Sequence, residues 1–297
     1  MTVLDTGAIA SALAVAGVAF EPTGLRLLER EDRIAAILPG NRIAWFPTNR
    51  VGRDRLEREA RVLALLARHC RFTAPTVTHD TPDFQLRTLV EGETDPSRAY
   101  RRVQSDPAYA RTLGMGLGQV LADQHRIPPA ELGWLPRIPS WPEPRFDIAR
   151  DLPRVTDDRA LVLRALAHIE HHEAEVAASV DRVLAHGDFG LHNFALAADG
   201  SLAGVFDYDG AALLDRHHDF AYLVFDTGND ALFQAAVTAY TAAGGRPIDP
   251  DRVLRLNAAA AIGFLAYRVG SGPDERPAGR TLVEDLAWTR LALDRLG

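Results

Sequence analysis

The chain has 297 residues, 47% of them hydrophobic, so it is long enough to bury a substantial core as one large domain or two lobes. Its formal net charge of -7 argues against a nucleic-acid partner, because such partners usually require a basic surface. Cys70 is the only cysteine, which excludes an intramolecular disulfide and a cluster of zinc-bound thiolates and fits a reducing cytoplasm.

The first third of the chain has the pattern of a small antiparallel sheet with one main helix. Short apolar runs between turn residues indicate strands, and we expect them at 25–29, 33–38, 42–46 and, as a pair, within 75–90. Helices are expected at 9–18 and, from apolar side chains at helical spacing, at 53–68. We predict that these elements form an N-lobe at 1–92.

The remainder, 93–297, is predicted to be a mainly helical C-lobe. Its expected helices are 113–125, 157–184 and most of the chain after Asp219, and a hairpin is expected from strands at 194–197 and 202–206. The run Gly114-Met115-Gly116-Leu117-Gly118 lies inside a helical pattern with no strand before it. It therefore predicts close helix packing and not a dinucleotide-binding turn. The fold class is α+β.

The apolar run at 8–20 is shorter than the about 20 residues that a membrane span needs. No basic segment precedes it and no small-residue cleavage site follows it. We therefore expect a soluble cytoplasmic protein with no membrane partner and no nucleic-acid partner. The sequence does not predict its oligomeric state.

The stretch HGDFGLHN, followed after a hairpin by Asp207-Tyr208-Asp209, has the layout that phosphoryl transfer requires. That reaction needs a carboxylate to orient and deprotonate the attacking hydroxyl, and further oxygen ligands to hold Mg²⁺ against the phosphates. Asp188 and Asn193 lie five residues apart on one tight loop, and the hairpin returns a second Asp. This is the order of the catalytic and metal loops of kinases.

In these motifs the chain resembles the aminoglycoside phosphotransferase family, a broad group of small-molecule kinases. The resemblance rests on HGDFGLHN at 186–193 and on GVFDYDGAALLDRHHDFAYL at 204–223. It implies a two-lobed protein-kinase-like fold, a small antiparallel-sheet N-lobe and a mainly helical C-lobe. It also implies Asp188 as the catalytic base, Asn193 and Asp207 as Mg²⁺ ligands, and Asp219 as a structural anchor of the catalytic loop.

Weaker similarities to the same family imply further residues that bind the nucleotide and the acceptor. The segment LEREARVLALLARH at 56–69 resembles the small-lobe helix of the family, with Glu59 as its glutamate. The segment LVEGE at 89–93 resembles the hinge that binds adenine, which implies that Leu89 and Glu91 contact the nucleotide. Asp209 and Asp215 fall on acidic positions of the family and are expected to face the substrate.

The resemblance implies transfer of the γ-phosphoryl of ATP or GTP, with Mg²⁺, to a hydroxyl of an antibiotic-like or metabolite acceptor. A cationic acceptor fits best if carboxylates form one wall of its site. The candidates for that wall are Asp209, Asp215, Asp274, Glu275, Glu284 and Asp285. For the last four, the simpler interpretation is an exposed acidic surface that favours solubility.

One position departs from the family pattern. The family has a Lys, or sometimes an Arg, on the third strand before Phe-Pro, which holds the nucleotide phosphates and pairs with the helix glutamate. In this chain that position is Trp45. All 33 basic residues are arginines, so no lysine can take its place. Either Arg42, Arg50 or Arg53 reaches the phosphates, or the chain is a degenerate kinase-fold module that binds or regulates. We favour the enzyme, because its base and metal ligands are present.

The histidines support other chemistry only weakly. A metal-dependent hydrolase built on the His and Asp residues would leave the N-lobe unexplained. His168, His171 and His172 are expected on a solvated helix face, and His217 and His218 are expected at the surface or behind the site.

Overall fold

The computed structural model describes residues 6–20, 25–137, 147–178, 181–276 and 280–296. The structure separates into two compact units, one made of Met1–Pro96 and His192–Ala211 and the other of Ser97–Leu191 and Ala212–Gly297. The hairpin around residue 200 therefore belongs to the first unit, although it lies far along the chain. The lobe boundary after residue 92 stays a prediction.

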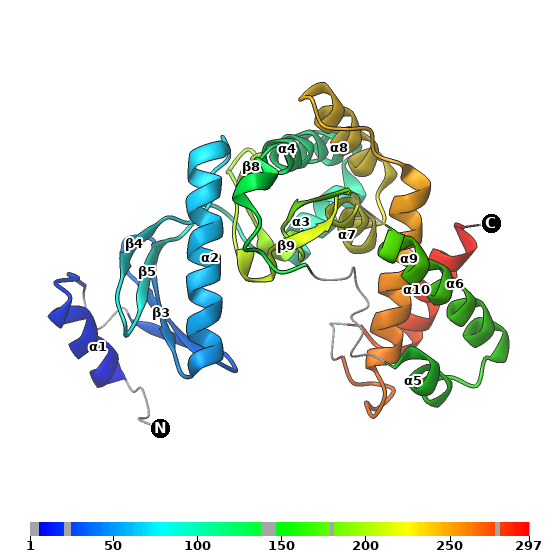
Figure 1. Cartoon of the computed structure of the whole chain (residues 1–297), viewed down its shortest axis with the longest axis horizontal. Helices are drawn as coiled ribbons and strands as arrows, with labels where there is room; N and C mark the ends of the chain where they lie inside the picture. The colour runs from blue at the N-terminus through cyan, green and yellow to red at the C-terminus, as the bar shows by residue number, and fades with distance from the viewer. Residues whose placement is uncertain (1–5, 21–24, 138–146, 179–180, 277–279, 297) are drawn as a thin grey trace. The chain divides into compact units, whose positions relative to one another are not determined.

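A five-stranded antiparallel sheet, in the order β1-β2-β3-β5-β4, is the frame of the first unit (Figure 1). Its strands are β1 (Arg26–Glu29), β2 (Arg33–Leu38), β3 (Arg42–Pro47), β4 (Val77–Asp80) and β5 (Gln85–Thr88). The register places Ala35 on one side of Trp45 and Gln85 on the other. Trp45 is thus in an interior strand, flanked by β2 and β5.

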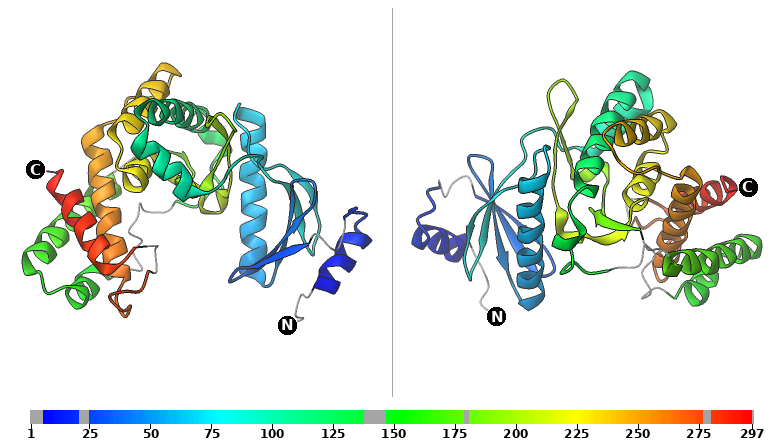
Figure 2. Two further views of the ribbon diagram at one scale, coloured as in Figure 1. Left: turned by 180° about the vertical axis from the view of Figure 1, so that it is seen from behind. Right: turned by 45° about the horizontal axis from the view of Figure 1, so that its top comes forward.

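Helices cover both faces of this sheet. α1 (Thr6–Val15) packs Ile9 and Leu13 into a core with Ala44 and Phe46 of β3, and α2 (Arg50–His69) lies on the opposite face (Figures 1 and 2). Successive side chains of a strand point to opposite faces. Trp45 therefore lies on the face that α2 covers.

The start of α2 is fixed by two local features. The side chain of Asn49 accepts a hydrogen bond from the amide of Gly52 at 3.0 Å, which caps the first turn. A Cβ atom on Gly52 would lie 2.0 Å from the carbonyl oxygen of Asp32. Only glycine lets the helix approach the turn before β2 this closely.

The hairpin of β7 (Phe194–Leu196) and β8 (Leu202–Val205) is tied to the first unit by backbone contacts. The amide of Glu93 donates to the carbonyl of Leu196 at 2.8 Å, and the amide of Leu196 donates back at 2.9 Å. The amide of Val205 donates to the carbonyl of Thr73 at 3.0 Å. The short helix η4 (Tyr208–Gly210) follows the hairpin.

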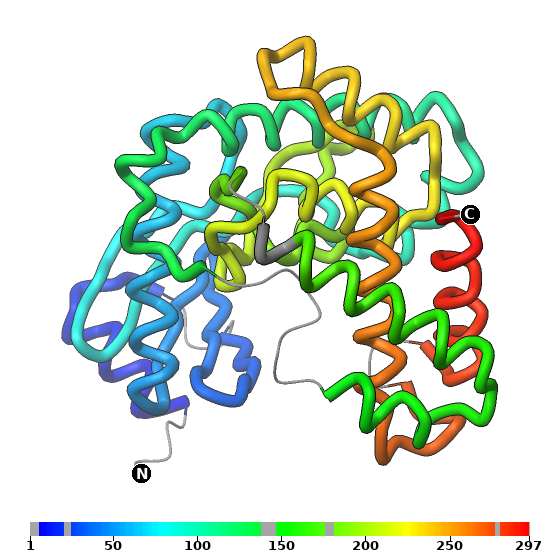
Figure 3. The backbone as a smooth tube through the Cα atoms, turned by 45° about the vertical axis from the view of Figure 1, so that its right-hand side comes forward, coloured from blue at the N-terminus to red at the C-terminus, as the bar shows by residue number. Residues whose placement is uncertain are grey.

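The second unit is mainly helical, with one small antiparallel pair of strands. Its strands are β6 (Arg182–Ala185) and β9 (Ala212–Asp215). Its α-helices are α3 (Pro96–Ser105), α4 (Pro107–His125), α5 (Ile148–Val155), α6 (Arg159–Ala178), α7 (His218–Thr227), α8 (Asp230–Ala242), α9 (Pro250–Tyr267) and α10 (Leu282–Asp294). Short 3-10 helices lie at η2 (Pro129–Glu131) and η3 (Leu191–Asn193). Figure 3 shows α6 and α10 beside α9, and these helices share a buried apolar core with α5.

The glycine-rich run in α4 packs against α8, as predicted. A Cβ atom on Gly114 would lie 2.3 Å from the carbonyl oxygen of Leu232, and one on Gly118 would lie 2.1 Å from that of Ala236. The helix begins where Asp106 accepts hydrogen bonds from the amides of residues 108 and 109. These glycines bring two helix backbones together.

The α+β class and the order of the predicted elements are confirmed, with three corrections. The helix predicted at 157–184 ends at Ala178, and its last predicted part includes strand β6, which pairs with β9; residues 179–180 lie outside the described part. The prediction also missed α3, α5 and β9. His172 is 3% exposed, so its expected place on a solvated helix face is wrong. Among the described helices, none is long and apolar enough to cross a membrane.

Candidate active site

The loop that carries Asp188 is held by one buried carboxylate. Asp219, at the start of α7, is fully buried. It accepts hydrogen bonds from the amides of His186 at 2.8 Å and Gly187 at 3.1 Å, and a longer one from Gln124 Nε2 at 3.3 Å. Gly187 has a φ of 85°, a backbone conformation that favours glycine. The predicted anchoring role of Asp219 is confirmed.

Tyr222 is a functional candidate that the sequence reasoning missed. It lies on α7 three residues after Asp219, and its hydroxyl is hydrogen-bonded to the carboxylate of Asp188. Burial raises the pKa of Tyr222, and the negative charges of Asp188 and Asp226 raise it further. The phenol therefore stays protonated and donates to Asp188. Its i, i+3 spacing from Asp219 was the signal that could have revealed it.

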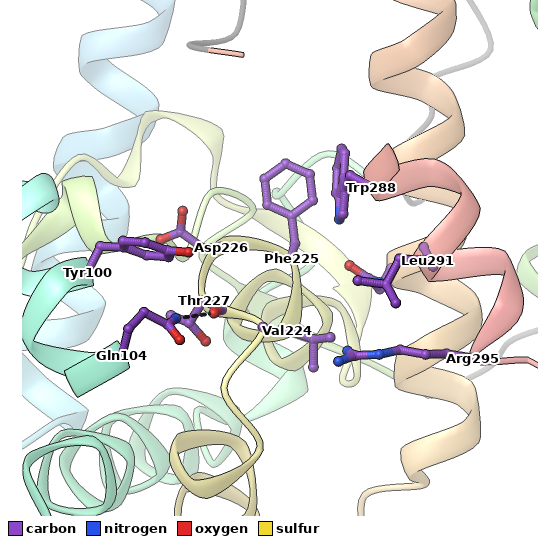
Figure 4. A pocket seen from close by; sticks show the side chains of 12 residues that line it. Tyr100, Gln104, Val224, Phe225, Asp226, Thr227, Trp288, Leu291 and Arg295 are labelled. Carbon is purple, nitrogen blue, oxygen red and sulfur yellow. Dashed lines mark hydrogen bonds between the residues drawn. The ribbon is translucent and has the colours of Figure 1, made fainter. Parts of the chain in front are cut away.

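Asp226 connects the same loop to a pocket. Its Oδ2 accepts a hydrogen bond from the amide of Leu191 at 2.6 Å. The pocket has a volume of about 300 Å³. Asp226 and Tyr100 lie at one end of it, and Trp288 and Leu291 lie at the other (Figure 4). Its place beside the loop makes this pocket a candidate site for an acceptor.

The pocket combines aromatic surface with a few polar groups. Phe225 and Trp288 meet edge to face, with ring centroids 4.3 Å apart. Asn257 also lines the pocket; it is 3% exposed, and its Oδ1 has no hydrogen-bond partner among the described residues. A buried amide without a partner is costly unless a ligand or water satisfies it. An apolar wall with a few polar groups is typical of small-molecule sites.

The predicted metal ligands lie at the end of the hairpin in the first unit. Asn193 is 2% exposed, and its carbonyl accepts the amide of Phe206 at 3.0 Å, which brings the next residue, Asp207, beside it along the hairpin. Asp207 is exposed and has a φ of 63°, in the left-handed region. A residue other than glycine rarely adopts this conformation, and such outliers cluster at functional sites.

Glu59 of α2 contacts the residue after Asp207. Its Oε1 accepts a hydrogen bond from the amide of Tyr208 at 3.1 Å, and its Oε2 lies 2.5 Å from Nη1 of Arg87. The Glu59 and Arg87 side chains are 5% and 3% exposed, so this ion pair is almost shielded from water. The partner of the helix glutamate therefore comes from β5.

Arg33 contacts the same turn directly. Nη2 of Arg33, on β2, lies 2.7 Å from Oδ2 of Asp209, and its guanidinium lies 4.9 Å from the ring centroid of Trp45. Burial alone would lower the pKa of Arg33, but Asp209, Glu59 and Asp207 raise it above its ordinary value. Arg55 and Arg58 also approach Asp209, at 3.8 and 3.9 Å. The substrate role predicted for Asp209 stays a prediction.

The residues expected at the hinge lie just after β5. The amide of Leu89 donates to the carbonyl of Asn41 at 2.7 Å, and Glu91 accepts a hydrogen bond from the Asn41 side chain at 2.6 Å. Both assignments to the nucleotide stay predictions, since each residue contacts Asn41 in this structure.

The three arginines proposed as the phosphate cation lie elsewhere in the first unit. Arg42 donates to the carbonyls of Pro39 at 3.3 Å and Ala19 at 2.7 Å. Arg53 donates to the carbonyl of Thr81 at 2.9 Å. The Arg50 side chain is 92% exposed and pairs with Asp54. Each has other contacts, and a role of Arg42 toward nucleotide stays a prediction.

Asp215 lies in a buried cluster of the second unit. It is 5% exposed and contacts His217 Nδ1 at 2.6 Å and Arg252 Nη2 at 2.5 Å. Burial alone would raise the pKa of this carboxyl, but the hydrogen bonds from His217 and Arg252 lower it well below its ordinary range. These are the contacts of a structural ion pair. Contact with a substrate stays a prediction.

Two residues of the expected acidic surface have structural contacts. Asp285 is 1% exposed and accepts hydrogen bonds from Arg268 at 3.0 Å and Arg280 at 2.7 Å, so its expected exposure is wrong. Glu284 and Thr281 form the capping box of α10. Both carboxylates stabilise the last helix.

The donor set on the hairpin fits Mg²⁺. Mg²⁺ prefers oxygen ligands and is usually bound by one or two carboxylates together with substrate phosphates. Asp207 supplies an exposed carboxylate, and Asn193 supplies an amide oxygen. Within the described ranges there is no group of three His, Cys, Asp or Glu side chains that could hold a metal ion.

Comparison with known proteins identifies a family whose sequence pattern the chain matches. Residues 43–255, more than half of the chain, match the phosphotransferase enzyme family. No curated protein matches the chain.

Solved structures share the fold over nearly the whole chain. The GDP complex of wild-type aminoglycoside 2'-phosphotransferase-IIIa has a TM-score of 0.66 and 16% identity, and the match covers 98% of this chain and 99% of that one. The apoenzyme of macrolide 2'-phosphotransferase MphH from Brachybacterium faecium has a TM-score of 0.64 and 23% identity, covering 99% and 98%. The streptomycin-ATP-APH(2")-IIa ternary complex has a TM-score of 0.65 and 16% identity, covering 91% and 95%. At identities this low, the structural matches show a common kinase-like fold and nothing finer.

Proposed function

Because the chain belongs to the phosphotransferase enzyme family and is therefore a phosphotransferase, we propose that it is a small-molecule kinase. It transfers the γ-phosphoryl of ATP or GTP to a hydroxyl of an antibiotic-like or metabolite acceptor. The single observation that carries this proposal is the fixed position of Asp188. A fully buried Asp219 holds the backbone before it, and Tyr222 binds its carboxylate.

In this proposal Asp188 is the catalytic base. It accepts the proton of the acceptor hydroxyl while that oxygen attacks the γ-phosphorus and the bond to the nucleoside diphosphate breaks. The hydrogen bond from Tyr222 orients the carboxylate before the acceptor arrives. Asn193 and Asp207 would hold Mg²⁺, which supplies positive charge to the phosphates when it is bound.

The acceptor is proposed to bind in the pocket beside the catalytic loop. Phe225 and Trp288 offer aromatic surface to a ring of the acceptor, and the amide of Asn257 offers a buried hydrogen-bonding group. Asp226 adds a carboxylate, so an acceptor with hydroxyl or amino groups fits. The solved structures of similar fold that bind aminoglycosides, such as the streptomycin complex, agree with this class.

The proposal is tested by nucleotide binding and by turnover of hydroxylated acceptors. Asp188→Asn is expected to lower kcat by about 10²–10⁴-fold, because it removes the general base, and to leave Mg²⁺-dependent nucleotide binding near the wild-type level. Asp207→Asn is expected to weaken that binding. Asp199→Asn, at the exposed turn of the same hairpin, is the control and should change neither property. Undiminished turnover by Asp188→Asn would contradict the proposal.

A further inference from the structure

The ion pair between Arg87 and Glu59 lies beneath α2. Arg87 is 2% exposed, and its guanidinium is held on two sides. Nη1 lies 2.5 Å from Glu59 Oε2, and Nη2 donates to Gln85 Oε1 at 2.7 Å. A buried guanidinium with charge-assisted contacts on both sides has one well-defined geometry.

The pair reaches the metal-binding turn through a backbone hydrogen bond. Glu59 uses its second oxygen to accept the amide of Tyr208 at 3.1 Å. The peptide bond that carries this amide joins Asp207 to Tyr208. Asp207 has a φ of 63°, a conformation that persists only where its surroundings hold it. The contact with Glu59 fixes one side of that peptide.

Arg87 lies on the same face of the sheet as Trp45. β3 and β5 pair Trp45 with Gln85 and Ile43 with Arg87, so the two side chains are neighbours across the strands. The resemblance implies a basic side chain at position 45, paired with the helix glutamate. In this chain the cation that pairs with Glu59 comes from the neighbouring strand. Trp45 instead lies beside the guanidinium of Arg33, 4.9 Å from its ring centroid.

We infer that Arg87 is a positioning residue that replaces the basic side chain expected on β3: by holding Glu59, it keeps Asp207 in the conformation that binds Mg²⁺. Arg87 acts through Glu59 and not on the phosphates, since it is 2% exposed. The inference rests on the proposed function, because it assigns a role to Mg²⁺ and nucleotide. It makes Trp45 part of a rearranged network and not a sign of lost activity.

The test measures how strongly Mg²⁺ strengthens nucleotide binding. Calorimetry gives the Kd of ATP and of GTP with and without Mg²⁺, and the ratio of the two values is the Mg²⁺ enhancement. In Arg87→Gln this enhancement is expected to fall by about 10–100-fold, as is typical when a group behind a metal ligand is removed. The Kd without Mg²⁺ should stay near the wild-type value. A general folding defect would weaken both values together.

Matched variants separate position from charge. Glu59→Gln should lower the enhancement to a similar degree, and the double variant with Arg87→Gln should be no worse than either single variant. Arg87→Lys keeps the charge without the fork of donors, so its enhancement should lie between the wild type and Arg87→Gln. Arg26→Gln, on the exposed side of β1, should bind as the wild type does.

The outcomes distinguish the inference from the proposed function. If the wild type binds neither nucleotide at millimolar concentration with Mg²⁺, the proposed function itself fails. If the wild type shows Mg²⁺ enhancement and folded Arg87→Gln keeps it, the inference alone is overturned. If Arg87→Gln does not fold, Arg87→Lys and Glu59→Gln decide the matter: an unchanged enhancement in both overturns the inference, and a loss in both supports it.

Discussion

The loop that carries Asp188 and the turn that begins at Asp207 are held by different kinds of contact. Backbone amides of the first donate to the buried carboxylate of Asp219. The second is held by ion pairs, in which arginines of the sheet contact Glu59 and Asp209. The loop depends on hydrogen-bond geometry, and the turn depends on the balance of charges.

This difference predicts different sensitivities. A hydrogen bond between a buried carboxylate and an amide is screened little by salt, whereas the contacts of the partly exposed Arg55 and Arg58 with Asp209 should weaken as ionic strength rises. A chain whose 33 basic residues are all arginines can build the second kind of support with planar, permanently charged donors. Added salt should therefore change the effect of substitutions at the turn more than the effect of substitutions at the loop.

The largest effect is expected from Asp219→Ala. The substitution leaves the amides of His186 and Gly187 without their acceptor, and we expect a loss of about 3–5 kcal/mol in the free energy of unfolding. Urea denaturation measures this loss, and 1 M salt should not change it. Asp157→Asn, an exposed residue before α6, is the control and should lie within about 0.5 kcal/mol of the wild type. A small, salt-dependent loss for Asp219→Ala would contradict the comparison.

The next effect is expected at Asp209. Asp209→Asn removes the charge that faces the buried Arg33, and we expect a loss of about 1–3 kcal/mol in unfolding free energy at low salt. The part of the loss that comes from the partly exposed Arg55 and Arg58 should shrink in 1 M salt, whereas the part that comes from the buried Arg33 should remain. Asp54→Asn is the matched control, because its pair with Arg50 is exposed and should contribute between 0 and about 1 kcal/mol. Equal losses at both positions would show that burial of the pair does not matter.

A smaller effect, on catalysis alone, is expected from Tyr222→Phe. Loss of the hydroxyl removes one hydrogen bond to Asp188, and kcat should fall by about tenfold, which corresponds to about 1.4 kcal/mol. The KM for nucleotide should not change, because the Tyr222 hydroxyl binds Asp188, which is the proposed base and is not proposed to bind nucleotide. Tyr267→Phe, at a half-exposed position, is the control. An unchanged kcat would show that Asp219 alone positions the loop.

The motif-bearing segments were predictable because their contacts are local. The spacing of Asp188, Asn193 and Asp207 is set by one loop and one short hairpin, and turn residues mark that hairpin. The capped helix around Glu59 was readable from its apolar spacing. Such signals come from residues that lie close together in the sequence.

The supporting contacts could not be predicted because their partners are distant in the sequence. Arg87 pairs with Glu59 only because β5 lies next to β3, and no local pattern specifies that strand order. The prediction that the helix runs to Leu184 was wrong for a related reason. Short apolar runs such as the one in β6 fit a buried strand or a helix equally, and its partner β9 comes later in the chain.

The smallest expected effect is a loss of stability at low pH, and it arises from two histidines of the second unit. Burial lowers the pKa of His125 and of His172 to about 4, and both lie in the second unit. In the unfolded chain these rings titrate near pH 6.5, so between about pH 6.5 and 4 the unfolded state binds more protons and stability falls as the pH falls. When the pH falls from 7 to 6, each ring should lower the free energy of unfolding by roughly 0.5–1 kcal/mol. Denaturation at both pH values measures this cost, and His172→Gln should remove its share while the exposed control His171→Gln should not. An unchanged pH dependence in His172→Gln would show that the pKa of this ring is the same in the folded and unfolded states.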